Sequence, residues 1–159
     1  VLCCGYHGWQ DWFIGTTTRG AGVPAAVSGL TVPFPYNDLA ALEARLQQHE
    51  GAVAAIIMEP MGVVEPAAGY LEGVRKLAVS HGAVLIFDEC WTGFRLHLEG
   101  AYGKFGVAPD IACFGKAIGN GVPISVMVGQ ADVMGILNEA FFSFTFGGDR
   151  RWRVWRART

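Results

Sequence analysis

Two segments of the chain repeat apolar residues at the spacing of an amphipathic helix. In the first, three leucines share one helical face: Leu39, Leu42 and Leu46. Asn37 is a candidate N-cap before them and Gly51 lies just beyond the end, which predicts a helix over residues 38–50. The second segment ends at His81-Gly82 after four apolar residues with the same spacing: Leu71, Val74, Leu77 and Ala78. It predicts a second helix.

Short apolar runs between and after these helices have the length of strands: residues 53–58, 83–87, 111–114 and 123–128. Their continuous apolar character is typical of strands covered on both faces. Residues 1–4 predict a further strand and residues 131–140 a further helix. The stretch 15–36 holds Gly, Thr and Pro without a sustained period and predicts a loop.

Strands that alternate with helices through short joints predict an α/β fold, with a mostly parallel sheet and helices on both faces. Ligands of such sheets bind outside the carboxyl ends of the strands. Three polar groups follow predicted strands and should meet at that edge: Glu59, Asp88-Glu89 and Gly115-Lys116. A single carboxylate after a strand is more often a solvated strand end or an N-cap, but several together favour a site.

Composition narrows the classes of function. The 159 residues are 52% hydrophobic, with 22 glycines and a net charge of −2, which fits one α/β domain. Residues 1–149 alone carry seven basic and 14 acidic side chains, a poor surface for nucleic acid. No apolar run approaches the roughly 18 residues of a membrane span. Four cysteines without CxxC spacing favour a reduced, cytoplasmic location, and the four histidines are dispersed, so we expect no metal.

Lys116 is the lysine with the strongest chemical context, at the end of an apolar run inside a glycine-rich turn. A lysine desolvated there would suit Schiff-base chemistry. The two competing motifs fail. A phosphate-binding P-loop needs Gly at 110 and Ser or Thr at 117, where the chain has Asp and Ala, and the dinucleotide motif lacks its third glycine after Gly121.

Several motifs in this order resemble class III aminotransferases, which are pyridoxal-phosphate enzymes of the aspartate-aminotransferase fold. The resemblance covers about residues 1–149 and rests on five segments: Tyr6-His7-Gly8, Glu59-Pro60, residues 85–95 (LIFDECWTGFR), residues 109–124 (PDIACFGKAIGNGVPI) and residues 143–148 (SFTFGG). It implies a partial large cofactor-binding domain over residues 1–149, with pyridoxal 5'-phosphate as cofactor.

The resemblance implies a role for each matched position. Lys116 would bind the cofactor as a Schiff base and move a proton, and Asp88 would pair with the pyridine nitrogen. Tyr6 would lie against one face of the ring and Cys90, where the family usually has Val, against the other. The remaining cofactor-binding residues would be His7, Gly8, Glu59 and Thr145. Thr145 resembles the residue that reaches the phosphate of a neighbouring subunit, which implies a homodimer. Arg95 matches a frequent family arginine, for which a structural salt bridge is the favoured role.

The implied reaction is transfer of an amino group between a small-molecule amino donor and a carbonyl acceptor. Glutamate-1-semialdehyde 2,1-aminomutase, which moves the group within one molecule, shares this chemistry and stays open as an alternative. The family's phosphate loop before Tyr6 and its small C-terminal domain have no counterpart here, so a truncated, non-catalytic fragment also stays open. Residues 150–159 match nothing in the family, and their alternating Arg and Trp favour a shifted reading frame over a genuine basic tail.

Overall fold

The computed structural model describes residues 1–141 of the chain. Within that range the strands are β1 (Leu2–Cys4), β2 (Val32–Pro33), β3 (Ala55–Met58), β4 (Val84–Asp88), β5 (Ile111–Phe114) and β6 (Val126–Gly129). The helices are α1 (Asp11–Ile14), α2 (Ala25–Ser28), α3 (Leu39–Gln48), α4 (Tyr70–Ser80), α5 (Gly100–Phe105) and α6 (Ala131–Met134). Two 3-10 turns complete the described part, η1 (Lys116–Ile118) and η2 (Gly135–Asn138). The tail 150–159 lies outside it.

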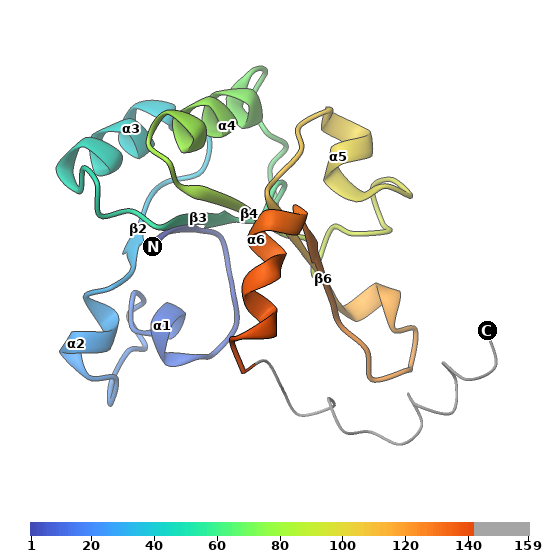
Figure 1. Ribbon diagram of the computed structural model, residues 1–159, viewed down its shortest axis with the longest axis horizontal. Coiled ribbons are helices and arrows are strands. Elements are labelled where there is room, and N and C mark those ends of the chain that lie inside the picture. Colours follow the sequence, from blue (N-terminus) through green and yellow to red (C-terminus); the bar gives the residue numbers. More distant parts are fainter. Residues whose placement is uncertain (142–159) are drawn as a thin grey trace.

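The strands form one sheet in the order β2-β1-β3-β4-β5-β6. All neighbours are parallel except β6, which runs antiparallel to β5. Helices α3 and α4 lie on one side of this sheet, and α1, α2 and α6 lie on the other (Figure 1). The predicted α/β class with a mostly parallel sheet is therefore confirmed.

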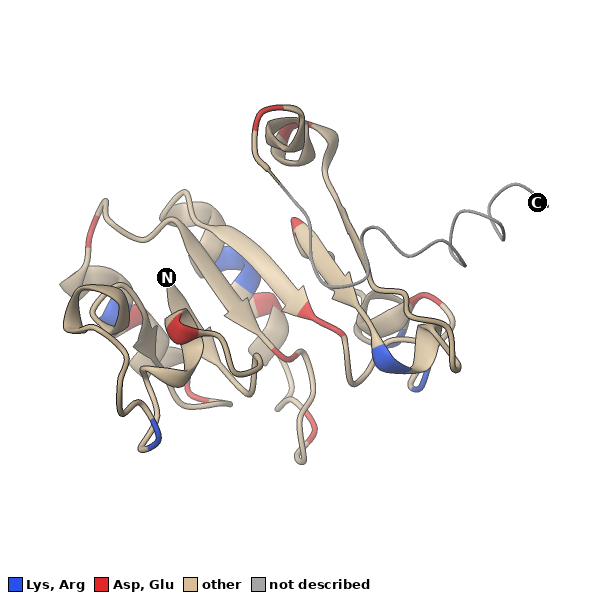
Figure 2. Ribbon diagram, turned by 90° about the horizontal axis from the view of Figure 1, so that it is seen from below, with Lys and Arg blue, Asp and Glu red and all other residues tan. Residues whose placement is uncertain are grey.

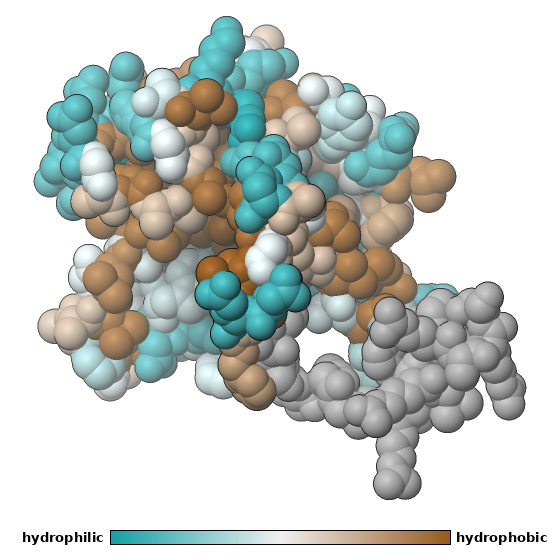
Figure 3. Space-filling model, viewed as in Figure 1, coloured by the Kyte–Doolittle hydropathy of each residue, from teal (hydrophilic) through white to brown (hydrophobic). Residues whose placement is uncertain are grey.

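The core lies between the sheet and the α3–α4 layer. Its fully buried side chains come from both layers: Leu42, Leu46, Val74 and Ala78 from the helices, and Ile56, Met58, Leu85 and Phe87 from the strands. The opposite face of β3 and β4 is only half-buried among the described residues, so the prediction that both faces are fully covered is wrong there. Hydrophobic surface accordingly shows between the two helical layers in Figure 3.

The first long helix begins one residue later than predicted. Asp38, not Asn37, is its N-cap: the side-chain Oδ1 accepts a hydrogen bond of 2.8 Å from the Ala41 amide. Asn37 instead adopts a left-handed backbone, with φ of 61°, and its side chain bonds the Glu65 carbonyl and the Ala67 amide. It therefore fixes the loop after β3 rather than the helix.

The structure differs from the predicted elements at three other places. The segment 15–36 contains α2 and β2, whose four- and two-residue lengths are too short to give a period in the sequence. Helix α5 was not predicted, because Gly100 and Gly103 interrupt its apolar pattern. The helix predicted over residues 131–140 is α6 followed by the 3-10 turn η2. Lys and Arg are sparse on the described ribbon (Figure 2), and none of its helices is long and apolar enough to cross a membrane.

Asp110 ties three elements together beneath the sheet edge. Its Oδ2 accepts hydrogen bonds from Arg75 Nη1 of α4, at 2.6 Å, and from the Leu85 amide of β4, at 2.8 Å. Its Oδ1 accepts one from Gln130 Nε2, at 2.9 Å. Burial raises the pKa of Asp110, but the hydrogen bonds from Arg75 and Leu85 and the Arg75 charge outweigh it, so the net shift is downward.

We expect Asp110→Ala to lower the free energy of unfolding by about 2 to 3 kcal/mol, because it leaves a buried amide and a half-buried guanidinium without their acceptor. Urea denaturation of both chains measures the difference. Glu65→Gln is the matched control, since it breaks an exposed ion pair with Lys104 and should leave the urea midpoint nearly unchanged. Equal midpoints for wild type and Asp110→Ala would contradict this role.

Candidate active site

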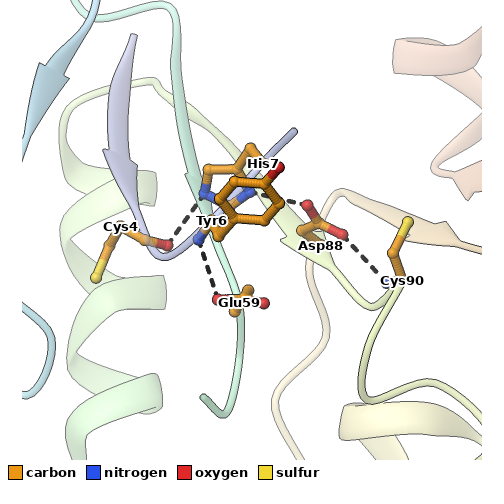
Figure 4. A network of polar contacts seen from close by, with 6 residues as sticks. All are labelled: Cys4, Tyr6, His7, Glu59, Asp88 and Cys90. Atoms are coloured by element: carbon orange, nitrogen blue, oxygen red, sulfur yellow. Dashed lines mark hydrogen bonds and ion pairs between the residues drawn. The ribbon is translucent and has the colours of Figure 1, made fainter. Parts of the chain in front are cut away.

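The carboxyl edge of the sheet brings together residues that are far apart in the sequence. Tyr6 and His7 follow β1, Glu59 follows β3, Asp88 ends β4, and Lys116 follows β5. Figure 4 shows the first four side chains converging with that of Cys90 between the ends of the three strands. The predicted gathering of polar groups at this edge is present in the structure.

His7 joins β1 to β4 through its two ring nitrogens. Nδ1 lies 2.8 Å from Asp88 Oδ2, and Nε2 lies 3.1 Å from the Cys4 carbonyl oxygen. A carbonyl oxygen and a carboxylate can only accept, so both contacts are complete when both ring nitrogens carry hydrogen. The imidazole is fully buried, stacked on Trp12 at 5.9 Å and packed against the edge of Phe13 at 5.3 Å. Its orientation is therefore fixed.

Asp88 is held as a carboxylate. Burial raises its pKa, but hydrogen bonds from His7 and from the Cys90 amide, together with the His7 charge, outweigh burial and lower the pKa below its usual range. The Cys90 amide donates to Oδ1 at 3.1 Å. The side chain stays 15% exposed, so the ionised group can still meet a ligand at the edge of the sheet.

Glu59 fixes the turn that carries Tyr6. Its Oε2 accepts a hydrogen bond of 3.1 Å from the Tyr6 amide. A Cβ on Gly5 would lie 2.6 Å from the same oxygen, and Gly5 has a φ of 105°, so glycine is required there. The Tyr6 ring packs edge-on against Phe13 at 5.6 Å and remains 61% exposed. Gly8, with a φ of 100°, returns the chain toward α1.

Lys116 starts η1 in a left-handed backbone conformation, with a φ of 46°. Its side chain is exposed, so the expectation of a desolvated lysine is wrong for the described chain. The physical reason is that η1, the turn that carries Lys116, has no buried residue within the described chain. Its Nζ lies 5.3 Å from the centroid of the Trp91 ring.

Cys90 lies between Asp88 and Lys116. Burial and the Asp88 charge raise the pKa of its thiol to about 12, although the nearby Lys116 charge acts in the opposite direction. The thiol is therefore protonated and neutral at the site, close in character to the apolar side chain of the resembled family. In Figure 4 it lies beside Asp88, on the side away from Tyr6.

Sequence reasoning missed Trp91 around this site and placed Glu89 wrongly, since it expected the Glu89 carboxylate at the open edge of the sheet. Trp91 lies beneath Lys116, and the only sequence signal was an aromatic residue within the matched segment 85–95. Glu89 turns into the fold, where its buried carboxylate accepts from the Ala101 amide at 2.8 Å and from Thr92 Oγ1 at 3.3 Å. Arg95 makes no ion pair with residues 1–141, so the expected salt bridge is not present there, and its Cζ lies 5.7 Å from the Trp91 centroid. Thr145 lies outside the described residues.

The sequence and the fold both match known proteins. The family profile for aminotransferase class-III matches residues 5–151 of the chain. The chain belongs to the class-III aminotransferase family. A glutamate-1-semialdehyde 2,1-aminomutase of Roseiflexus castenholzii is 47% identical over 148 residues, and the match covers 85% of this chain and 34% of that protein.

Solved structures of a transaminase and of an aminomutase superpose on this chain. A transaminase with PLP bound aligns with a TM-score of 0.82 and 25% identity, covering 91% of this chain and 39% of that one. A glutamate-1-semialdehyde-aminomutase from Pseudomonas aeruginosa PAO1 aligns with a TM-score of 0.71 and 30% identity, covering 92% and 36%. The class-III chain spans about a third of the length of the curated relatives it matches.

The two neighbouring carboxylates of this class-III chain should have opposite effects on its acid stability. The folded pKa of Asp88 lies below the 3.8 of the unfolded chain, so its stabilisation is full above that pH and is lost as pH falls through the folded value. Burial raises the pKa of Glu89 above 4.5, so its contribution is full below that pH and is lost as pH rises through the folded value.

Thermal melting between acid and neutral pH measures both effects. We expect the advantage of wild type over Asp88→Asn to shrink as the pH falls through the acidic range. The stability of wild type relative to Glu89→Gln should change in the opposite direction, falling as the pH rises. Parallel curves for wild type and Asp88→Asn would show that the His7–Asp88 contact contributes no pH-dependent stability.

Proposed function

We propose that the chain carries the cofactor-binding core of an enzyme that transfers amino groups with pyridoxal 5'-phosphate. The observation that supports this most directly is the Asp88 carboxylate, which His7 and the Cys90 amide hold ionised at the edge that also carries Lys116. This donor set fits the cofactor, because a fixed anion suits a protonated pyridine nitrogen and a primary amine suits its carbonyl.

Each residue of the set would have a separate task. When bound, pyridoxal 5'-phosphate supplies a conjugated ring that accepts electrons from a carbon of the substrate. Asp88 would accept the hydrogen bond of the ring nitrogen and keep it protonated, while His7 holds Asp88. Tyr6 and Cys90 would pack against the two ring faces, and Glu59 and Gly8 would shape the loop that carries Tyr6. Lys116 would attach the cofactor and later carry a proton at its Nζ.

A glutamate-1-semialdehyde 2,1-aminomutase is the second candidate. It is favoured by the curated relatives, which carry that name at 42–47% identity. Both reactions use the same three groups: Tyr6, Asp88 and Lys116. In a transaminase the amino group passes from one molecule to another, whereas in an aminomutase it moves within one molecule. The residues of the sheet edge therefore favour neither reaction.

The remaining assignments also stay proposals. Residues 1–149 would form the partial large cofactor-binding domain, with 150–159 a separate basic tail, and the site would work in a homodimer with an amino donor and a carbonyl acceptor as substrates. The cytoplasmic location stays a prediction from the cysteine pattern, and all four thiols are free in the structure. A chain that folds without binding the cofactor would instead fit the non-catalytic fragment.

Cofactor capture by the chain tests the proposed function. The chain is mixed with pyridoxal 5'-phosphate, reduced with borohydride and digested, and the modified lysine is found by peptide mass. We expect modification at Lys116 well above Lys76 and Lys104, and its loss in Lys116→Ala. Lys104→Ala is the control and should retain it, because Lys104 pairs with Glu65 away from the site. If the three lysines were labelled equally, only the interpretation as a non-catalytic fragment would remain.

A chimera tests which of the two reactions this chain supports within a whole aminomutase. Residues 5–141 replace the matching third of the Roseiflexus castenholzii relative, which supplies the other two thirds of the protein. Conversion of glutamate-1-semialdehyde without an added amino donor would favour the aminomutase, whereas activity that requires a donor and an acceptor would favour the transaminase. Asp88→Asn in the active chimera should lower kcat by orders of magnitude, since the ring nitrogen loses its anionic partner.

A further inference from the structure

The turn that follows β4 packs directly against the strand end that carries Lys116. A Cβ on Gly115 would lie 3.2 Å from Cys90 Sγ, so the two residues are already in close contact. Gly93 lies against the ring of Phe114 so closely that a Cβ there would overlap it. Lys116 Nζ lies 5.3 Å from the centroid of Trp91 in the same turn. Three consecutive residues of one strand end therefore rest on one turn.

This turn is anchored independently of Lys116. The Glu89 amide donates to the Cys113 carbonyl at 2.8 Å, and the Gly93 amide donates to the Glu89 carbonyl at 2.9 Å. The buried Glu89 carboxylate binds Thr92 and the amide of Ala101. Phe94 continues the turn in a left-handed conformation, with a φ of 61°. Trp91 therefore projects from a fixed support, although its own side chain is 57% exposed.

Within the described chain, the Lys116 amine lies over the ring of Trp91. No carboxylate of residues 1–141 lies within ion-pair distance of Lys116 Nζ, whereas Lys104 has Glu65 at 2.8 Å. An ammonium over an indole face is attracted by the negative face of the ring, and Trp is the strongest aromatic partner for it. The guanidinium of Arg95 also lies over the Trp91 ring, with its Cζ 5.7 Å from the ring centroid.

We propose that Trp91 is a positioning residue whose indole ring holds the ammonium group of Lys116 at the mouth of the site before a carbonyl ligand arrives. The proposal rests on the proposed function of Lys116. The ring limits the directions that a long, exposed side chain explores, so the amine is presented to a ligand docked on Asp88. An unanchored aldehyde gains nothing from this, because it must compete with the ring for the amine.

Methyl NMR tests the contact without any cofactor. Reductive methylation with ¹³C-formaldehyde labels the three lysines and leaves them charged. We expect the Lys116 methyl signal to be shifted by the ring current of Trp91, to return toward the Lys76 position in Trp91→Leu, and to stay shifted in Trp91→Phe. Lys104 Nζ lies 5.2 Å from the centroid of the Phe105 ring, so the Lys104 signal should not move in any of these variants. Trp9→Leu is the matched control for loss of an exposed indole at the same edge.

Two capture rates test the role. In each, Nζ forms a bond to the aldehyde carbon with loss of water, and a borohydride reagent supplies the hydride that fixes the product. With formaldehyde, Lys116 of Trp91→Leu should react about two- to five-fold faster relative to Lys76 than in wild type, the factor that corresponds to an exposed cation–π contact. With pyridoxal 5'-phosphate the same variant should react more slowly, and Trp91→Phe should lie between.

Rates that change in the same direction with both aldehydes would overturn the proposal, because a general change in exposure or folding would cause that. An unmoved Lys116 methyl signal in Trp91→Leu would overturn it as well. Failure of wild type to capture pyridoxal 5'-phosphate at Lys116 would defeat the proposed function and the positioning role with it. In that case the methyl shift alone would still report whether the two side chains are in contact, which separates the two failures.

Discussion

The contact between His7 and Asp88 is the constraint on which the site depends. One buried imidazole reaches from the Cys4 carbonyl of β1 to the carboxylate of β4, across the end of β3 that lies between them. The contact requires both strands to end at the same level and the turn after β1 to fold back at once. Gly5 and the Glu59 carboxylate meet that second requirement. Moving a charge out of water is costly unless the charge is paired. The Asp88 carboxylate therefore needs His7 beside it, and His7 is beside it only when β1 and β4 are in this register.

Asp88 and Glu89 show how adjacent residues of one type take different tasks. They follow the same strand, but one carboxylate faces the open edge and the other points into the protein below α5. Hydrogen bonds and the charge of His7 overcome burial at Asp88, whereas burial prevails at Glu89, where the partners are an amide and a hydroxyl without charge. The first carboxylate is available to a ligand. The second fixes the turn that places Trp91 and Cys90 beside Lys116.

Features that depend on local sequence could be predicted, and features that depend on distant contacts could not. The apolar period of α3 and α4 and the apolar runs of β3, β4 and β5 gave these elements within about two residues. Parallel topology then placed Glu59, Asp88 and Lys116 at one edge. The bond of His7 to Asp88 spans 81 positions and leaves no local pattern. Helix α5 depends on the Glu89 carboxylate and not on its own period, and the exposure of Lys116 depends on what covers η1. Neither feature can be predicted from the residues that neighbour it in the sequence.

Exposure divides the site into two parts with different requirements. The groups that set charge, the buried His7 and the partly buried Asp88, are fixed by the sheet itself. The groups that would touch a ligand directly, Tyr6 and Lys116, are exposed and are fixed by one aromatic neighbour each, Phe13 and Trp91. His7 and Asp88 are therefore preorganised before any ligand binds. Tyr6 and Lys116 gain low-dielectric surroundings only when a ligand covers them. Affinity at this edge should thus come mainly from the Asp88 anion and the Lys116 amine, and less from enclosure by residues 1–141.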